Sequence, residues 1–282
     1  MNNVQTFSYF FIEKAYLVLL VLKRECMLRE RLNITAHSGC DGTLQDTIES
    51  VLAGVKHGAD AVEVDVRANA RGKLILSHDK DPNVLYQGHP LLEDVFTIVA
   101  GESSPGVNCD VKEPETIPAI LQLARQKNVP PEKLILSGSA RPSMLEKNPS
   151  ISTSAQVWLN VEEIIEDYYR TGASVMEPYR HLVDPQSRRH EILKALAPKF
   201  EDFLVPMIGD CKRLGVKAIN MPYTELTRSI MSRIISLGIQ VSVWTINDED
   251  KMRELFGLGV INVTTRNTRL AVEVRDSLNP AK

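Results

Sequence analysis

Two carboxylates stand two residues apart in the short segment Val62-Glu63-Val64-Asp65-Val66. Alternation of apolar and acidic residues with a period of two is typical of a β-strand, so Glu63 and Asp65 lie on the same side of that strand. Either this side faces water at the edge of a sheet, or both carboxylates point into the protein. In the second case a cation must offset the cost of burying them.

Other polar residues come at or near the ends of predicted strands elsewhere in the chain. They are His37, His78, Asp110, Lys112, Trp244 and Asn247. Asp110 and Lys112 are again two apart and so lie on one side of a strand. Together with Glu63 and Asp65, Asp110 provides the oxygen ligands that Mg²⁺ or Ca²⁺ prefers. The Lys112 ammonium beside them suits an anionic phosphate.

Each of these residues also has an ordinary structural interpretation. A single histidine at a strand end is more often structural or exposed than catalytic, and an alternating acidic strand is more often a solvated edge than a metal site. The Val62–Val66 strand, however, comes second in a series of covered parallel strands. Unpaired carboxylates inside such a sheet would cost several kcal/mol each, which favours the metal site.

The elements that must position these side chains alternate along the chain. Predicted strands cover residues 33–37, 62–66, 73–79, 106–112, 132–138, 151–160, 216–220, 239–247 and 260–265. Predicted helices cover residues 43–58, 91–101, 117–127, 161–172, 187–208, 224–238 and 248–259. The first helix is expected to begin at Thr43. In residues 160–216 two helical segments are predicted, with no strand between them.

This alternation predicts βαβ units and a parallel sheet. About eight strands in roughly 250 residues is the size of a (β/α)₈ TIM barrel, whose active site lies at the C-terminal ends of the strands. The polar residues named above gather at that end. An open doubly wound sheet is the alternative, although no GxGxxG or GxxxxGK[ST] loop follows any strand.

The composition is that of an ordinary globular protein, with 43% hydrophobic and 24% charged residues. The net charge is −3 and no basic block is present, so we expect no nucleic-acid partner. Four scattered cysteines without CxxC spacing argue against a zinc cluster or a disulfide framework. They fit a reducing compartment, and we expect a cytoplasmic protein.

Residues 1–30 contain an apolar run, Ala15–Leu22, that is far shorter than the roughly 20 residues of a membrane-spanning helix. The basic residues follow the run and no small-residue cleavage site comes after it, unlike in a signal peptide. Two interpretations stay open: an amphipathic extension that packs on the body, or a native start at Met27. We expect no membrane association and a single domain over residues 31–282.

Several segments resemble a known family, occur in family order and cover most of residues 33–265, with a poor match at 139–216. They are ITAHSG, TLQDTIESVLAGVKHGADAVEVDV, GKLILSHD, VNCDVK, INMPYTELTRSIMSRIISLGIQVSVWTIN and GLGVINVTT. The histidine loop, the E-x-D strand and the following His-Asp pair together make a specific signal. The chain resembles the glycerophosphodiester phosphodiesterase family, a branch of the phosphatidylinositol-phospholipase-C-like TIM barrels.

The resemblance implies roles for eight residues. The implied acid–base pair is His37 and His78. The implied metal ligands are Glu63, Asp65 and Asp110, for Mg²⁺ or Ca²⁺. The implied substrate-binding residues are Lys112, Trp244 and Ser38. The implied reaction is metal-dependent hydrolysis of a small-molecule glycerophosphodiester or related phosphodiester, in which a neighbouring glycerol hydroxyl attacks first.

The chain departs from the family pattern at several positions. The family usually has arginine after the first histidine, a bidentate phosphate ligand that Ser38 cannot replace. The family's Pro-Glu-Asn-Thr stretch is here Leu44–Thr47, and its late Thr-Asp pair is Thr265-Arg266. The loss at Ser38 suits a catalytically weak barrel that only binds a phosphodiester or lipid head group. A Schiff-base lyase using Lys112 is a further alternative, although it has no need of three carboxylates.

Overall fold

The computed structural model describes residues 32–80 and 88–278. The predictions made for the first 30 residues, an amphipathic extension or a start at Met27, therefore lie outside the described residues. Within the described ranges, no helix combines the length and the apolar character needed to cross a membrane.

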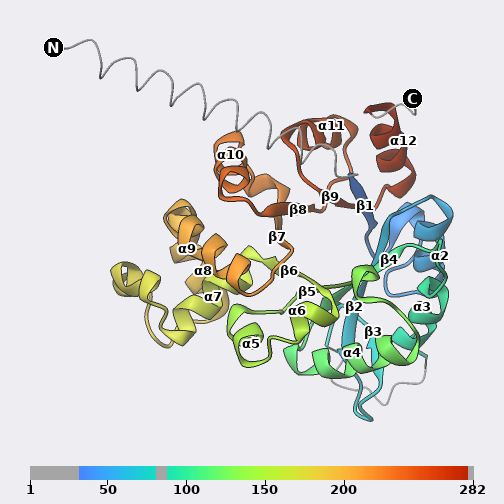
Figure 1. Cartoon of the computed structure of the whole chain (residues 1–282), viewed down its shortest axis with the longest axis horizontal. Coiled ribbons are helices and arrows are strands. Elements are labelled where there is room, and N and C mark those ends of the chain that lie inside the picture. The colour runs from blue at the N-terminus through green and yellow to red at the C-terminus, as the bar shows by residue number, and fades with distance from the viewer. Residues whose placement is uncertain (1–31, 81–87, 279–282) are drawn as a thin grey trace.

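A ring of parallel strands forms the centre of the molecule (Figure 1). The strands are β1 (Asn33–Ala36), β2 (Ala61–Ala68), β4 (Gly106–Val111), β5 (Leu134–Gly138), β6 (Gln156–Asn160), β7 (Ala218–Pro222), β8 (Gln240–Trp244) and β9 (Asn262–Thr265). Each pairs in parallel with the next, and β1 closes the ring by pairing with both β2 and β9. The predicted (β/α)₈ TIM barrel is confirmed, and the open doubly wound sheet is excluded because the sheet has no free edge in the ring.

Helices surround the ring and connect its strands (Figure 1). The α-helices are α2 (Ile48–Lys56), α3 (Leu92–Val99), α4 (Ile117–Gln126), α5 (Pro142–Lys147), α6 (Ile151–Ser154), α7 (Val161–Thr171), α8 (Arg189–Leu196), α9 (Phe200–Arg213), α10 (Arg228–Leu237), α11 (Glu249–Leu258) and α12 (Thr268–Leu278). The 3₁₀ helices are η1 (Cys40–Gly42), η2 (Pro114–Thr116), η3 (Pro131–Lys133), η4 (Ser174–Leu182), η5 (Ala197–Lys199) and η6 (Tyr223–Glu225). Residues 161–217, all described, contain no strand, in agreement with the sequence.

The structure corrects several expected elements. The helix expected at 224–238 begins at Arg228, after η6, and η5 divides the helix expected at 187–208 into α8 and α9. The run at 73–79 gives only β3 (Leu74–Leu76), which pairs antiparallel with β2 because the turn at 69–72 reverses the chain. The predicted strand at 151–160 is α6 followed by β6, because burial of Ile151 and a hydrogen bond from Ser152 Oγ to Leu214 O hold the first turn helical. The first helix begins at Ile48 rather than Thr43, since Asp46 has a φ of 57° that no α-helix accommodates.

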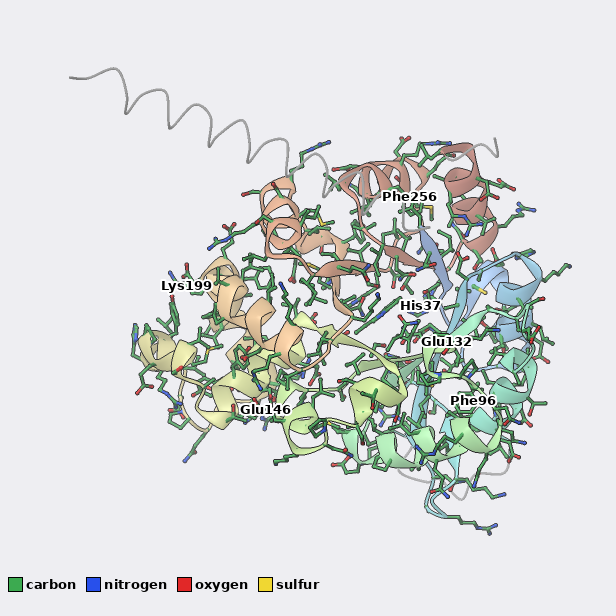
Figure 2. The ribbon with its side chains drawn as sticks, in the orientation of Figure 1. His37, Phe96, Glu132, Glu146, Lys199 and Phe256 are labelled. Atoms are coloured by element: carbon green, nitrogen blue, oxygen red, sulfur yellow. The ribbon has the colours of Figure 1, made fainter. Side chains whose placement is uncertain are left out.

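The strands bury apolar side chains on their outer side, against the helices. On β2, Val62, Val64 and Val66 belong to this outer core. The opposite side of the ring holds a small apolar cluster, made of Ala61, Ile135, Trp158, Ala218 and Ile261. Since side chains alternate along a strand, Glu63 and Asp65 lie on the same side as Ala61, inside the barrel. Figure 2 shows the contrast, with His37 near the middle of the molecule and Phe96 and Phe256 among the helices.

Candidate active site

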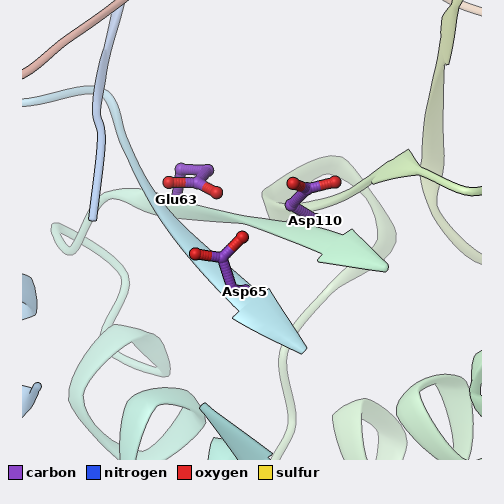
Figure 3. Close-up of side chains that lie close together, drawn as sticks. All are labelled: Glu63, Asp65 and Asp110. Atoms are coloured by element: carbon purple, nitrogen blue, oxygen red, sulfur yellow. The ribbon is translucent and has the colours of Figure 1, made fainter. Parts of the chain in front are cut away.

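Three carboxylates from two adjacent strands meet inside the barrel (Figure 3). Glu63 and Asp65 come from β2 and Asp110 from β4, and the strand register places Asp65 directly beside Asp110. One oxygen of each carboxylate lies within 4.8 Å of one oxygen of the other two. The acidic side of the Val62–Val66 strand therefore faces inward, and the solvated-edge interpretation is wrong.

Burial makes this cluster electrostatically costly. The Glu63 side chain is 6% exposed and Asp65 is 1% exposed. Burial, and then repulsion from the Asp65 and Asp110 carboxylates, hold the pKa of Glu63 well above its ordinary value. Burial also raises the pKa of Asp110, although Lys112 opposes the shift. The raised pKa values mean that the negative charge of the three carboxylates is not fully balanced by the positive charge around them.

Lys112 neutralises only part of the cluster. Its Nζ lies 2.6 Å from Asp65 Oδ1 and 2.6 Å from Asp110 Oδ2. Burial alone would lower the pKa of Lys112, but the two carboxylates outweigh it and hold the pKa above its ordinary value, so the amine is an ammonium. Asp65 Oδ2 is buried without a hydrogen-bond partner among the described residues. Three carboxylates, one of them with a free buried oxygen, fit a hard divalent cation.

His37 follows β1 and approaches the cluster from the neighbouring strand end. Its Nδ1 lies 2.8 Å from Ser38 O and 3.7 Å from Glu63 Oε2. Burial lowers the pKa of His37, and Arg266 lowers it further, against the opposing effects of the Ser38 carbonyl and the carboxylates. The neutral ring donates Nδ1–H to Ser38 O, which leaves the Nε2 lone pair free to accept a proton.

His78 comes after β3 and is held at the rim of the same cavity. Its backbone N–H donates to Asp46 Oδ2 at 2.9 Å. Its Nδ1 lies 2.9 Å from Asp79 Oδ1, and 59% of the side chain is exposed. The ring is therefore oriented by a carboxylate and remains accessible from solvent.

A cavity of about 390 Å³ at the C-terminal ends of the strands connects these groups. Of the side chains predicted from the sequence, the cavity is lined by His37, Glu63, Asp65, His78, Asp110, Lys112 and Trp244. Asn247 instead binds backbone, since its Oδ1 accepts from Arg266 N at 2.8 Å. The structure brings two histidines, three carboxylates and one ammonium to one polar cavity, which suits proton transfer at an anionic group.

Ser38 is placed differently from the other predicted residues. Its side chain is 2% exposed, and its Oγ accepts a hydrogen bond from Asp46 N at 2.8 Å. Its backbone N–H donates to Glu63 Oε2 at 2.9 Å. Ser38 thus holds the loop after β1 against Asp46 and Glu63, and its hydroxyl is not part of the cavity wall. We therefore leave it out of the groups proposed to touch the substrate.

Sequence reasoning missed the remaining wall of the cavity. These residues are Gln45, Asn108, Ser137, Asn160, Asn220, Thr245, Thr264 and Arg266. Several are joined in pairs, such as Ser137 Oγ with Asn108 Oδ1 at 2.9 Å. A signal existed for Asn108, which stands two residues before Asp110 on the same side of its strand. Apart from Trp244, the side chains that line the cavity are polar or charged, which indicates a polar ligand.

Comparison with known proteins finds similarity to one family. The family model described as Glycerophosphoryl diester phosphodiesterase family matches residues 37–103, which include both histidines and the E-x-D strand. A glycerophosphodiester phosphodiesterase of Arabidopsis thaliana is 24% identical over 251 residues, which cover 82% of this chain and 70% of the relative. These similarities extend well beyond the matched motifs.

Solved structures share the fold. A glycerophosphodiester phosphodiesterase of Thermotoga maritima superposes with a TM-score of 0.59 at 19% identity, covering 86% of this chain and 98% of that one. An Oleispira antarctica phosphodiesterase, solved in complex with the product sn-glycerol-3-phosphate, gives a TM-score of 0.56 at 17% identity, covering 89% and 99%. Both of these solved chains are matched over nearly their whole length, so this chain has the same barrel fold.

Proposed function

Because this chain belongs to the glycerophosphodiester phosphodiesterase family, we propose that it is a phosphoric diester hydrolase that cleaves a glycerophosphodiester. The observation that carries the proposal is the convergence of Glu63, Asp65 and Asp110 with two histidines in one polar cavity. The structure of a homologous barrel with bound sn-glycerol-3-phosphate supports a substrate of this class.

In the proposed site, Glu63, Asp65 and Asp110 hold a divalent cation, Mg²⁺ or Ca²⁺. Such an ion neutralises negative charge that develops on phosphoryl oxygens. Lys112, already held at the rim of the cluster by Asp65 and Asp110, adds a positive charge beside the phosphate. Trp244 supplies a flat apolar wall at the end of β8, against which the carbon backbone of a small alcohol can pack.

The two histidines have different surroundings, which suggests different tasks. The neutral His37 ring, with Nδ1–H given to Ser38 O, is suited to remove a proton from the attacking hydroxyl or water through Nε2. As the new P–O bond forms and the bond to the leaving alcohol breaks, His78 gives a proton to the leaving oxygen. Exposure of His78 lets its ring exchange protons with solvent.

The wall of the cavity favours a small polar alcohol. Seven of the fifteen residues that line it carry an amide or a hydroxyl, among them Asn108, Ser137, Asn160 and Asn220. Such groups can bind glycerol hydroxyls, whereas an acyl chain in the cavity would gain no hydrogen bond from them. We therefore expect deacylated glycerophosphodiesters to be better substrates than lysophospholipids.

A hydrolysis screen tests the proposal. The purified chain is incubated with glycerophosphodiesters and lysophospholipids in Mg²⁺, in Ca²⁺ and in excess EDTA, and the released alcohol is measured. We expect metal-dependent turnover, lost in EDTA and restored by the ion. Full activity after confirmed metal removal would contradict the metal role. Binding of metal and sn-glycerol 3-phosphate without turnover of any substrate would instead favour a barrel that only binds the head group.

The lyase alternative is not supported by the geometry. Lys112 is bracketed by two carboxylates that keep it as an ammonium, and an ammonium has no lone pair with which to attack a carbonyl. Borohydride with a carbonyl substrate should therefore leave no adduct on Lys112.

A further inference from the structure

We propose that Arg266 is a phosphate-binding residue of this site and supplies the guanidinium that the chain lacks at Ser38. The inference rests on the proposed function, since it assigns a contact to the phosphate of the same substrate. Arg266 follows the last residue of β9 and lines the cavity together with His37 and Trp244.

The charges around the cavity single out Arg266. Among the residues that line it, the permanently positive side chains are Lys112 and Arg266. Lys112 is engaged by two carboxylates, at 2.6 Å each. Arg266 forms no ion pair with any carboxylate within residues 32–80 and 88–278. An unpaired guanidinium facing a polar cavity is a ready ligand for an anion, because its planar fork matches two phosphate oxygens.

Two hydrogen bonds, one from each neighbouring segment, hold the backbone of Arg266 at the mouth of the cavity. Its N–H donates to Asn247 Oδ1 at 2.8 Å, in the loop after β8. Its carbonyl accepts from Asp41 N at 2.7 Å, in the loop after β1. Asp41 belongs to η1, and Asn247 follows β8, so the two hydrogen bonds fix the backbone from which the Arg266 side chain starts.

The register of β1 and β9 brings the guanidinium to the catalytic end of β1. Ala36 pairs with Thr265, and His37 N donates to Thr265 O at 2.8 Å, so Arg266 stands next to His37. Arg266 Nε lies 3.5 Å from His37 Nδ1. That nitrogen already donates to Ser38 O, so it does not accept from Arg266, and the donors of the guanidinium stay available for a ligand.

Ser38 cannot bind the phosphate in the place of Arg266. The Ser38 side chain is buried and tied to Asp46, whereas the next strand end around the ring carries an arginine that the family pattern lacks. The guanidinium of this site therefore stands at residue 266, which the barrel closure places beside His37, and not at the residue after His37. A phosphate held there would lie between Arg266 and the Glu63, Asp65 and Asp110 cluster, with His37 at its side.

The test compares Arg266→Gln and Arg266→Lys with the matched control Arg269→Gln. Arg269 lies three residues away, is 77% exposed and contacts Glu273 rather than the cavity. KM and kcat are measured with the best glycerophosphodiester of the screen, and the Kd of sn-glycerol 3-phosphate is measured by calorimetry. We expect Arg266→Gln to raise both KM and Kd about 10- to 100-fold, the range for charge-assisted hydrogen bonds. Arg266→Lys should recover part of the loss, and Arg269→Gln should leave both constants unchanged.

The outcomes separate this inference from the proposed function. Turnover by the wild type with unchanged KM and Kd in Arg266→Gln overturns the role of Arg266 and leaves the hydrolase intact. Binding of sn-glycerol 3-phosphate that depends on Arg266, without turnover of any diester, supports Arg266 and overturns the hydrolase. A wild-type chain that does not bind sn-glycerol 3-phosphate at millimolar concentration with Mg²⁺ or Ca²⁺ present overturns the inference as well.

Discussion

The carboxylate of Asp46 holds the backbone of His78, accepting its N–H at 2.9 Å. The backbone N–H of Asp46 donates to Ser38 Oγ at 2.8 Å. Asp46 therefore joins the loop that carries His37 to the segment that carries His78, although the two histidines come from different strands. It stands in the left-handed region, with φ 57°, where Asp and Asn are tolerated better than other side chains.

This relationship predicts that Asp46→Ala lowers kcat about 10- to 100-fold, because a misplaced proton-transfer group loses rate steeply. Asp46→Asn keeps an oxygen for His78 N and should retain most of the activity. Kinetics with the best diester substrate are measured beside the melting temperature. Asn128→Ala is the matched control, since Asn128 has φ 56° in the turn after α4, outside the cavity. If Asn128→Ala and Asp46→Ala reduce kcat equally, Asp46 has no positioning role.

The barrel and the carboxylate cluster were predictable because they depend on local alternation. Val62 to Val66 must bury one side against helices, and in a closed barrel the other side can only face inward. Asn108 could have been predicted as a cavity residue by the same rule. Local pattern failed at Ile151, where burial and a hydrogen bond from Ser152 to Leu214 favour a helical turn over a β-branched strand signal.

Arg266 and Ser38 were beyond sequence reasoning for a different reason. Arg266 reaches His37 across 229 residues of chain, and only the β1–β9 register reveals that contact. The burial of Ser38 depends on the left-handed conformation of Asp46, which turns the Asp46 backbone N–H toward the hydroxyl. The first feature is set by closure of the ring and the second by the conformation of the loop after β1.

The raised pKa of Glu63 predicts an unusual stability effect. A carboxyl whose pKa is higher in the folded than in the unfolded protein binds more protons when folded, so it lowers the free energy of unfolding as pH rises. Glu63→Gln should therefore stabilise the metal-free chain at pH 7, by roughly 2 °C in melting temperature for each kcal/mol. The glutamine can still accept from Ser38 N. The gain should shrink as pH falls toward 4.5, the ordinary pKa of the group.

Metal titration completes this comparison. Mg²⁺ or Ca²⁺ should raise the melting temperature of the wild type at pH 7 and have little effect on Glu63→Gln, because one ligand is gone. Glu93→Gln is the control, because the pKa of Glu93 is shifted in the opposite direction. The hydrogen bond and ion pair of Glu93 with Lys127 lower that pKa, and Glu93 lies outside the cavity. That variant should lose stability at pH 7 and keep the full metal response. A metal-free Glu63→Gln protein less stable than wild type would contradict the electrostatic account.

The two histidines should each be needed for turnover. His37→Ala and His78→Ala are expected to lower kcat about 10²-fold or more, since each removes a proton-transfer partner. Metal affinity measured by calorimetry should persist, because neither ring is proposed as a ligand. His190→Ala serves as the control, with a side chain 72% exposed on α8. Unchanged turnover in both single variants would leave the head-group-binding barrel as the better description.

Gly138 at the end of β5 is required by the geometry of Asp110. A Cβ at this position would collide with Asp110 Oδ1 and with the Val111 backbone, and its φ is +71°. Gly138→Ala should therefore push the Asp110 carboxylate out of the cluster and lower metal affinity about tenfold or more, in addition to a stability cost. Gly72→Ala isolates the backbone effect, since φ there is +74° and nothing lies within 4 Å of the added atom. We expect Gly72→Ala to cost about 1–2 kcal/mol of stability while calorimetry shows the wild-type affinity for Mg²⁺ or Ca²⁺. Equal metal affinity in the two alanine variants would show that the position of the Asp110 carboxylate does not depend on the missing side chain at Gly138.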